Sequence, residues 1–202
     1  FYVTDQEARN VIPQLSSIYD EPFADSSQIP TFLVSQIARR HVTVALSGDG
    51  GDEIFGGYNR YRFAQQWENL QGIPPFLQNI IARIFSGLSS TKIEEALHHL
   101  FFLKTKRIPQ IGDKLQKLAS VLGKKPDVVY ETLVRQSPLE ERVLKDRRLE
   151  SSFVMALHPL DAGSFTEKMM YADVMTYLPD DILVKVDRAA MAVSLETRAP
   201  FL

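Results

Sequence analysis

The sequence predicts an α/β fold in which helices predominate, and three stretches carry that prediction. A short β-branched run at 42–46 leads through a glycine-rich turn into a helical pattern at about 53–68, which is half of an α/β unit. From residue 73 onward the apolar residues recur at helical spacing and no strand pattern stands out. A last helical pattern covers 182–195. We therefore expect part of an α/β core at 1–72, an α-helical subdomain at 73–160, and helices at 161–202 that return to the active site.

The helices in front of the glycine-rich turn have recognisable start and stop signals. Thr4 and Glu7 have the spacing of a capping box, so we expect a helix over about 5–19, ending before Pro22. A second helical pattern covers 28–40, and its apolar residues lie on one face.

The later helices follow from the same kind of signal. Ser164 is the expected cap of one helix, and Asp180 or Asp181 is expected to open the last one. Between the glycine-rich turn and Ser164, helical patterns cover 76–88, 91–103, 109–122 and 126–136.

Composition limits the classes of function. The 202 residues are 45% hydrophobic and 24% charged with a net charge of -2, which gives no electrostatic support for binding nucleic acid or an anionic membrane. The chain has no cysteine, which excludes disulfides, zinc thiolate sites and thiol nucleophiles. No apolar run approaches the ~20 residues that span a bilayer. We expect a cytoplasmic protein, and the ends at Phe1 and Leu202 lead us to expect a piece of a longer polypeptide.

The most informative stretch is 47–58, which reads SGDGGDEIFGGY. It follows the expected strand, where α/β folds bind ligands, and the helix after it offers free N–H groups to an anion. Asp49, Asp52 and Glu53 would repel a bare phosphate, but carboxylates lie beside phosphates where Mg²⁺ is between them. The loop therefore predicts a magnesium-bridged nucleotide polyphosphate or pyrophosphate. The alternative is a helix entry whose acids only complement the helix dipole.

Spacing excludes three other glycine-loop or acidic-loop motifs. A Walker A loop needs Lys and Ser or Thr after its second glycine, where this chain has Gly57 and Tyr58. A dinucleotide fingerprint needs a glycine where Glu53 stands. An EF-hand that begins at Asp49 would need an acid where Arg60 stands.

A second cluster of charged residues occupies 180–191. Lys185 and Arg188 are three residues apart on one helix face, so two cations could converge on one anion. The alternative is a solvated face on which Lys185 pairs with Asp181 one turn away. The pair Tyr58 and Tyr61 is expected to pack rather than to stack on a substrate.

These motifs together resemble the synthetase domain of glutamine-hydrolysing asparagine synthetase. The resemblance is carried by three segments in the right order, 46–58, 187–191 and 194–202, and the segment 20–27 is similar to bacterial members. It implies an incomplete layer of the adenine nucleotide alpha hydrolase-like type, also called the PP-loop ATP pyrophosphatase fold, with an α-helical subdomain. The middle of the chain, 73–160, is only loosely characteristic.

The resemblance also implies a reaction. ATP adenylates the side-chain carboxylate of L-aspartate, pyrophosphate leaves, and ammonia made from glutamine attacks the acyl-adenylate to form asparagine. The family draws its ammonia from an N-terminal glutaminase domain and has an upstream Ser-Gly-Gly-x-Asp-Ser pyrophosphate loop. Neither occurs in these residues, so we expect this fragment to be inactive alone. The alternatives are a relative that activates another carboxylate, such as a β-lactam synthetase, a peptide cyclase or a polysaccharide amidotransferase, and a non-catalytic nucleotide-binding or interaction domain.

Roles carry over from the family by position. Asp49 takes the place of an acid important for acyl-adenylate formation, where some members have Glu. Lys185, with Arg188 as the alternative, is the expected cation that stabilises the phosphorus and the leaving pyrophosphate. The expected ATP contacts are Ser47, Gly48, Gly50 and Gly51, the expected Mg²⁺ ligands are Asp52 and Glu53, and the expected contacts to the substrate carboxylate are Asp25, Ser26 and Ser27.

Overall fold

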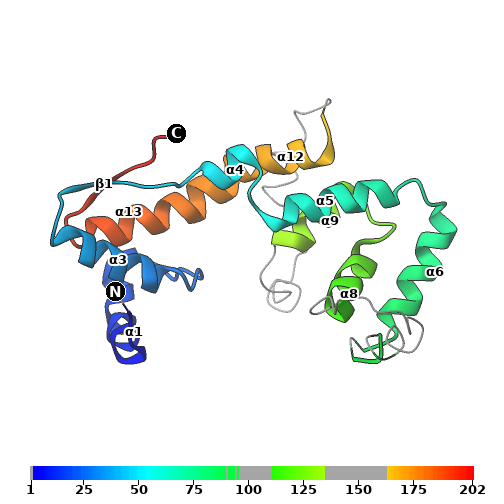
Figure 1. Ribbon diagram of the computed structural model, residues 1–202, viewed down its shortest axis with the longest axis horizontal. Helices are drawn as coiled ribbons and strands as arrows, with labels where there is room; N and C mark the ends of the chain where they lie inside the picture. Colours follow the sequence, from blue (N-terminus) through cyan, green and yellow to red (C-terminus); the bar gives the residue numbers. More distant parts are fainter. Residues whose placement is uncertain (1, 90, 94, 96–110, 135–162) are drawn as a thin grey trace. The chain divides into compact units, whose positions relative to one another are not determined.

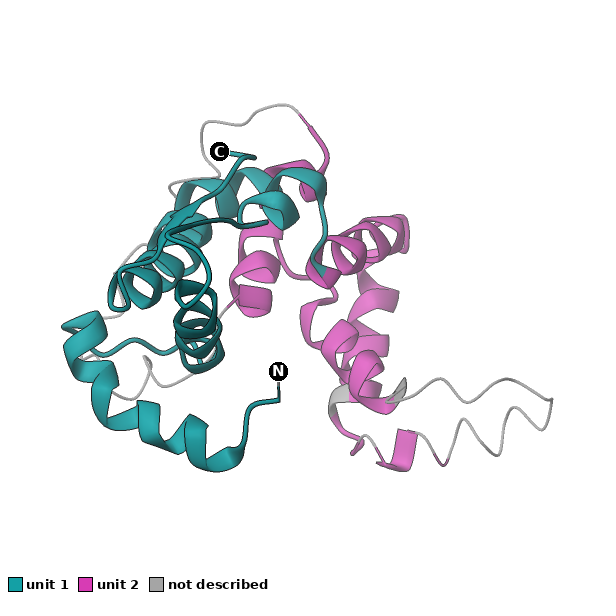
Figure 2. Ribbon diagram, turned by 60° about the vertical axis from the view of Figure 1, so that its left-hand side comes forward, with its two compact units in different colours: residues 1–58, 170–202 teal, residues 59–169 magenta. Residues whose placement is uncertain are grey.

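The computed structural model describes residues 2–89, 91–93, 95, 111–134 and 163–202. The chain forms two compact units, one made of residues 1–58 and 170–202 and the other of residues 59–169 (Figure 2). The first unit therefore contains the glycine-rich turn and the last helix, although these are far apart in the sequence. The domain boundaries expected at 72 and 160 remain predictions.

The first unit begins with a nearly continuous helix. It consists of α1 (Asp5–Val11), the short 3-10 turn η1 (Ile12–Gln14) and α2 (Leu15–Tyr19). The predicted capping box is confirmed, since the Glu7 amide donates to the Thr4 hydroxyl over 3.3 Å and the Thr4 amide donates to the Glu7 carboxylate over 2.8 Å. The helix stops at Asp20, whose φ of 62° is left-handed.

A small parallel sheet joins the two ends of this unit. After α3 (Gln28–Arg39), β1 (Val44–Leu46) pairs in parallel with β2 (Glu196–Arg198). The Ser47 amide continues the ladder by donating to the Arg198 carbonyl over 2.9 Å. The strand expected at 42–46 is present but shorter, at Val44–Leu46. β2 was not expected, because its three residues, Glu-Thr-Arg, have no strand pattern of their own.

The exposure of β1 differs from the expectation of a buried strand. Leu46 is 75% exposed and Val44 is 38% exposed. Parallel sheets are ordinarily covered on both faces by helices. Within the described residues this sheet has only two strands, so Val44 and Leu46, on either side of Ala45, are exposed.

The core of the first unit lies where the last helix packs on α3. Val11, Phe32, Leu33 and Ala189 are buried together, and partly buried apolar residues surround them: Leu15, Ile18, Ile29 and Val193. Ala189 belongs to α13 (Val184–Met191), which packs against α3 and β2 (Figure 1). The predicted apolar face of α3 is thus the surface that receives α13.

The last helix starts much earlier than the sequence suggests. α12 (Phe165–Ala172), the π-helix η2 (Asp173–Leu183) and α13 follow one another without a break. The expected opening at Asp180 or Asp181 is wrong, since both lie inside η2, as does Pro179. Proline ends many helices because it lacks an N–H, but the wider i→i+5 pattern of a π-helix accommodates it here. The expected end at 195 is also too late, because the helix ends at Met191 and Ser194 has a φ of 59°.

The glycine-rich turn is followed by two helices where the sequence suggests one. α4 (Gly51–Phe55) ends at Gly56, which is left-handed with a φ of 71°. α5 (Asn59–Leu70) then begins the second unit. The helical pattern at 53–68 is therefore interrupted at Gly56, one of the glycines of the expected ligand loop.

The second unit is helical throughout its described residues, as expected. Besides α5 it contains α6 (Pro75–Ser86), α8 (Ile111–Val121), α9 (Pro126–Val134) and the start of α12. The Trp67 indole N–H donates to the Val121 carbonyl over 3.1 Å, and its ring lies 5.0 Å from that of Phe165. Ser164 and Glu167 form the expected cap of α12. The helical pattern at 91–103 lies mostly outside the described residues.

None of the helices among the described residues is long and apolar enough to cross a membrane.

Removal of the Phe32 ring tests the core of the first unit. Phe32 is 5% exposed, so Phe32→Ala should lower the free energy of unfolding by about 3–5 kcal/mol, through lost burial and the cavity it leaves. Val34 is on the same helix and 62% exposed, so Val34→Ala should cost less than about 0.5 kcal/mol. Urea unfolding followed by circular dichroism measures both, and equal losses would contradict the proposed core.

Candidate functional site

The glycine-rich loop lies between β1 and α4, at the carboxyl end of a parallel strand. Ser47 is half-buried and its hydroxyl lies 3.5 Å from the Arg198 carbonyl, so the start of the loop is tied to the sheet. Gly50 is the N-cap of α4, with a φ of 84°. Left-handed φ is inexpensive only for glycine, which explains this residue type at the point where the chain turns into the helix.

The space beside the loop glycines is unequal. Nothing lies within 4 Å of a side chain placed at Gly48, but a side chain at Gly50 would lie 2.7 Å from Leu202, and one at Gly51 would lie 3.6 Å from the Phe201 ring. The Phe201 ring in turn contacts the Phe55 ring edge-on at 5.5 Å. In this structure the backbone is therefore open to a ligand at Gly48, while the chain's own residues lie against Gly50 and Gly51.

The three acids of the loop are in different environments. Asp49 is half-buried and Asp52 is exposed. Glu53 is 1% exposed, and its carboxylate accepts a hydrogen bond of 2.5 Å from the Tyr58 hydroxyl. A buried carboxylate with a hydrogen-bond partner is a stable arrangement, so Glu53 has a structural partner that the sequence did not suggest.

These environments decide how well the loop fits Mg²⁺. Among the described residues no three His, Asp or Glu side chains are grouped so as to hold a metal ion. Of the two expected ligands, only the Asp52 carboxylate is exposed. Mg²⁺ commonly binds one or two carboxylates together with substrate phosphates, so the exposed Asp52 fits that mode and the buried Glu53 fits it poorly.

The structure brings together residues from the 20–27 segment and the last helix. The Asp25 carboxylate accepts a hydrogen bond from the Lys185 ammonium over 2.6 Å through one oxygen. Its other oxygen accepts from the Ser27 amide over 2.8 Å and from the Ser27 hydroxyl over 2.7 Å. Ser26, next to them, is exposed. Asp25, Ser27 and Lys185 were predicted separately, and their contact was not.

Two carboxylates near Lys185 have opposite pKa shifts. Burial tends to raise the pKa of Asp25, but the hydrogen bonds from Lys185 and Ser27 outweigh it and hold the pKa below its ordinary value. Burial and the negative charge of Asp25 raise the pKa of Asp181, although Lys185 and a hydrogen bond from Tyr177 act the other way. Lys185 thus lies in the field of both carboxylates and forms its close ion pair with Asp25, not with Asp181 as the solvated-face alternative supposed.

Arg188 has a different partner and a different exposure. Its guanidinium donates to the Asp20 carboxylate over 2.8 Å, and the two side chains are 49% and 70% exposed. The two cations of α13 therefore do not converge on one anion in this structure. Each pairs with a different acid of the 20–27 segment.

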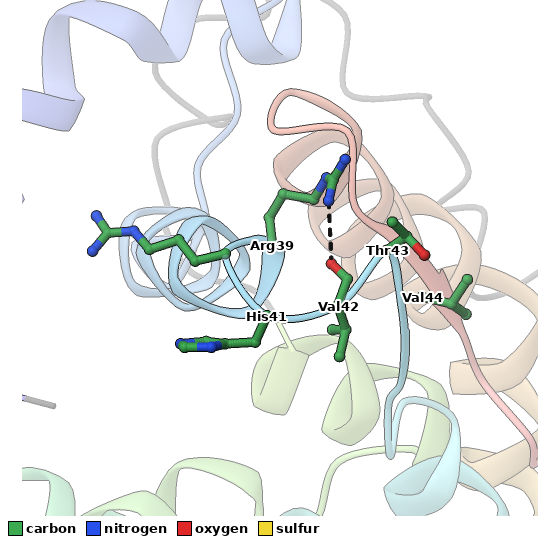
Figure 3. A pocket seen from close by; sticks show the side chains of 6 residues that line it. Arg39, His41, Val42, Thr43 and Val44 are labelled. Carbon is green, nitrogen blue, oxygen red and sulfur yellow. Dashed lines mark hydrogen bonds between the residues drawn. The ribbon is translucent and has the colours of Figure 1, made fainter.

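Two hollows lie elsewhere on the first unit. One, shown in Figure 3, lies where α3 ends and β1 begins, and Arg39 there donates to the Val42 carbonyl over 3.5 Å. Basic residues at a helix C-terminus complement the helix dipole, and this is the strand end opposite to the glycine-rich loop. The other hollow adjoins the 20–27 segment and is lined by Leu15, Ser16, Asp20, Glu21, Pro22, Phe23 and Gln28.

Sequence reasoning missed the roles of two tyrosines. Tyr58 was expected only to pack, but it bonds to Glu53 and its ring meets that of Tyr177 at 6.0 Å and 76°. Tyr177 lies one turn before Asp181 and hydrogen-bonds to it. Tyr177 and Asp181 have the spacing of one helical turn, but no local signal predicts a helix across Pro179. Tyr61, in contrast, is buried at 2% exposure, as packing requires.

An acidic glycine-rich loop at the carboxyl end of a parallel strand, followed by a short helix that packs on η2, defines a mostly helical protein with a small parallel sheet and a candidate site for an anionic ligand. The whole chain, residues 1–202, matches the family described as asparagine synthase. The chain belongs to the asparagine synthase family, as the motif resemblance implied.

Individual relatives agree with this assignment. The chain is 30% identical to the asparagine synthetase (glutamine-hydrolyzing) 1 of Bacillus subtilis, over 99% of this chain and 29% of that protein. It is 31% identical to the "Putative asparagine synthetase (glutamine-hydrolyzing) 2" of Methanocaldococcus jannaschii, over 95% of this chain and 34% of that protein. The chain thus spans about 30% of the length of the relatives it matches. No solved structure matches it significantly.

The loop glycines give a paired test. Gly50→Ala should destabilise the first unit by about 1–2 kcal/mol, because it forces a side chain into the left-handed region and against Leu202. Gly48→Ala should leave stability unchanged, since nothing lies within 4 Å of the new methyl group. Urea unfolding distinguishes the two variants. A stability loss at Gly48 as large as that at Gly50 would contradict the loop conformation.

Tyr19 gives a test of the environment of Asp25. Its hydroxyl donates to the Lys185 carbonyl over 3.1 Å, and burial, with the negative charge of Asp25, raises the pKa of Tyr19 to about 12. Because the folded pKa is raised, Tyr19 contributes stability below about pH 10 that is lost as the pH rises toward its folded value. Ultraviolet titration of the seven tyrosines should show a late component whose amplitude falls in Tyr19→Phe. A late component of unchanged amplitude in this variant would contradict the burial of the Tyr19 hydroxyl.

Proposed function

We propose that this chain is the part of an asparagine synthetase-type ligase that activates a carboxylate with ATP. The carboxylate oxygen of aspartate attacks the α-phosphorus, pyrophosphate leaves, and ammonia then attacks the acyl carbon and releases AMP. The observation that carries the proposal is the family match over residues 1–202, together with the acidic glycine-rich loop at the carboxyl end of β1.

The remaining parts of such an enzyme belong, in this proposal, to other segments of a longer polypeptide. These are the glutaminase domain that makes ammonia from glutamine and the upstream loop that binds pyrophosphate. The small share of the relatives that the chain spans supports this division. The exposed face of β1 and the parallel pairing with β2 support an incomplete PP-loop layer, since a parallel sheet of this kind is ordinarily covered on both faces.

The loop supplies the proposed ATP contacts. Ser47 and Gly48 are the best placed, since the backbone at Gly48 has no side chain near it. Gly50 and Gly51 are proposed to act through the shape of the turn, which presents the first amides of α4 to an anion. Asp49 follows Gly48 directly and is the proposed acid of acyl-adenylate formation.

Asp52 is the proposed Mg²⁺ ligand of this chain. Its carboxylate is exposed, while that of Glu53 is buried against Tyr58, so Glu53 is proposed to support α4 rather than to bind the ion. When bound, Mg²⁺ neutralises charge on the phosphates and on the leaving pyrophosphate. The protein's own contribution is to hold one carboxylate at the N-terminal turn of α4.

Arg188 is the better candidate for the cation that contacts phosphate. Its ion pair with Asp20 is solvent-exposed, and such pairs contribute only about 0–1 kcal/mol, so the guanidinium can exchange partners at little cost. A guanidinium also binds phosphate oxygens in a bidentate manner. Lys185, in contrast, is 11% exposed in its side chain and already paired.

The 20–27 segment is the proposed wall of the carboxylate pocket. Ser26 is exposed beside Asp25 and Ser27, whose polar groups bond to each other. These polar groups suit a carboxylate substrate in general, so the assay below compares aspartate with other acids.

The test is ATP–pyrophosphate exchange by the longer polypeptide, with and without L-aspartate. Exchange that depends on aspartate supports the proposal. Exchange with other acids alone would assign the chain to relatives such as β-lactam synthetases, and no exchange with any acid would favour a non-catalytic nucleotide-binding domain.

Asp52→Asn tests the proposed metal ligand in the same assay. It should lower aspartate-dependent exchange by about a hundredfold or more, because a bridging metal ion supplies several kcal/mol of charge stabilisation. Glutamine hydrolysis should remain largely intact. Asp113→Asn is the matched control, since Asp113 is an exposed acid in the first turn of α8 and the charge change is the same. Loss of exchange and of hydrolysis together would indicate a structural role for Asp52.

A further inference from the structure

We propose that Lys185 is a positioning residue: its ammonium, which pairs with the Asp25 carboxylate, holds the 20–27 segment on the last helix. This assignment rests on the proposed function in one respect only, the identification of the 20–27 segment as a wall of the carboxylate pocket. The contacts themselves are independent of any reaction. It differs from the catalytic role that the sequence suggested for Lys185.

The Asp25 carboxylate is fixed at both of its oxygens. One accepts from Lys185 over 2.6 Å, and the other accepts from the amide and the hydroxyl of Ser27 over 2.8 and 2.7 Å. An ionised carboxylate that accepts charge-assisted hydrogen bonds is held more firmly than one with neutral partners. Lys185 therefore orients the Asp25–Ser27 turn through the carboxylate that closes it.

Further contacts tie the same segment to its neighbours. The Tyr19 hydroxyl donates to the backbone carbonyl of Lys185 over 3.1 Å, and the Tyr19 ring stacks on Phe23 at 4.8 Å. The buried Gln28 amide donates to the Phe23 carbonyl over 3.0 Å. The Lys185 side chain thus contacts Asp25 within the segment, and its backbone contacts Tyr19 directly before the segment.

Burial and charge make Lys185 a poor ligand for a further anion. The side chains of Lys185 and Asp25 are 11% and 17% exposed. Asp181 lies close enough for its pKa to be affected by both of them, so one ammonium faces two carboxylates. A phosphate that captured this ammonium would leave Asp25 partly buried without its cation, which is strongly unfavourable. Arg188 and Asp20 form the same kind of pair at 49% and 70% exposure and carry no such constraint.

The same helix connects this ion pair with the helix behind the glycine-rich loop. Tyr177 hydrogen-bonds to Asp181, and its ring meets that of Tyr58 at 6.0 Å. The Tyr58 hydroxyl donates to Glu53 of α4 over 2.5 Å. The 20–27 segment and α4 are therefore both held against one helix, η2–α13. In the proposed reaction this helix would set the distance between the carboxylate and the nucleotide, and such positioning is a large part of catalysis.

The first experiment uses the 202-residue chain and needs no activity. Phe23 lies in the middle of the segment and is followed by Ala24, so cleavage after it by chymotrypsin, followed by mass spectrometry, reports how firmly the segment is held. Lys185→Met should speed this cleavage by about tenfold or more, the effect of losing one hydrogen bond to a charged group. Arg188→Met, the matched control, should change it by about twofold, as expected for an exposed ion pair. Equal effects of the two variants would overturn the proposal.

Carbon-13 NMR titration of the aspartates adds a spectroscopic signature. Lys185→Met should raise the pKa of both Asp25 and Asp181, because both lose the ammonium. Asp25→Asn should lower the pKa of Asp181, since it removes a neighbouring negative charge. The other titratable groups at this point, Tyr19 and Tyr177, stay neutral over the acid range. A pKa of Asp25 that does not respond to Lys185→Met would overturn the proposal.

A double-mutant cycle covers the case in which a single variant unfolds. Asp25→Asn combined with Lys185→Met removes both charges of the close ion pair, so it should be more stable than the sum of the single losses, by about tenfold or more in the unfolding equilibrium constant. The pair Asp20→Asn and Arg188→Met should be nearly additive, since that ion pair is exposed. Additivity of the Asp25 and Lys185 changes would overturn the proposal.

Pyrophosphate exchange by the longer polypeptide then separates positioning from catalysis. Lys185→Met should raise the KM for the acid by about tenfold and lower kcat by less, whereas Arg188→Met should lower kcat. Loss of kcat alone in Lys185→Met, with unchanged cleavage after Phe23, would make Lys185 the catalytic cation. If the wild type shows no exchange, the proposed function fails, while the cleavage and NMR results still decide the positioning role.

Discussion

The arrangement of the first unit depends on the parallel pairing of β1 with β2. This pairing brings residues 44–46 beside residues 196–198, and the Ser47 amide extends the ladder to the point where the glycine-rich loop begins. Because β2 directly follows the last helix, the same pairing sets α13 under the sheet and against α3. The loop, the 20–27 segment and the two cations of α13 therefore belong to one unit. In the sequence, the second unit lies between the cations and the other two.

Burial separates the roles of two cations that look equivalent in the sequence. Lys185 and Arg188 are one turn apart and both pair with acids of the 20–27 segment, at 2.6 and 2.8 Å. The first pair is mostly buried and lies next to a second carboxylate, so breaking it is expensive. The second is open to water, so breaking it costs little. The same comparison applies to Asp52 and Glu53, of which the first is exposed and the second is buried against Tyr58.

Contacts between side chains hold the short helix after the glycine-rich loop in place. The glycine-rich loop turns through a left-handed glycine into a short helix, and the contacts of Tyr58 and Tyr177 hold that helix against η2. The π-helical stretch is long, and π-helical turns are frequent at functional sites. Here it places the Tyr177 ring against that of Tyr58 and the Asp181 carboxylate near Lys185.

Local signals determined much of this protein. The capping residues Thr4 and Ser164, the α3 helix, the β1 strand and the acidic glycine-rich loop were all predictable, because each depends on residues within a few positions of one another. Tertiary structure decided the rest. It paired β2, whose Glu-Thr-Arg sequence has no strand pattern, and it continued a helix through Pro179. It also chose Asp25 rather than Asp181 as the close partner of Lys185, because the energy of an ion pair depends on distance and burial, and both come from segments that the sequence keeps far apart.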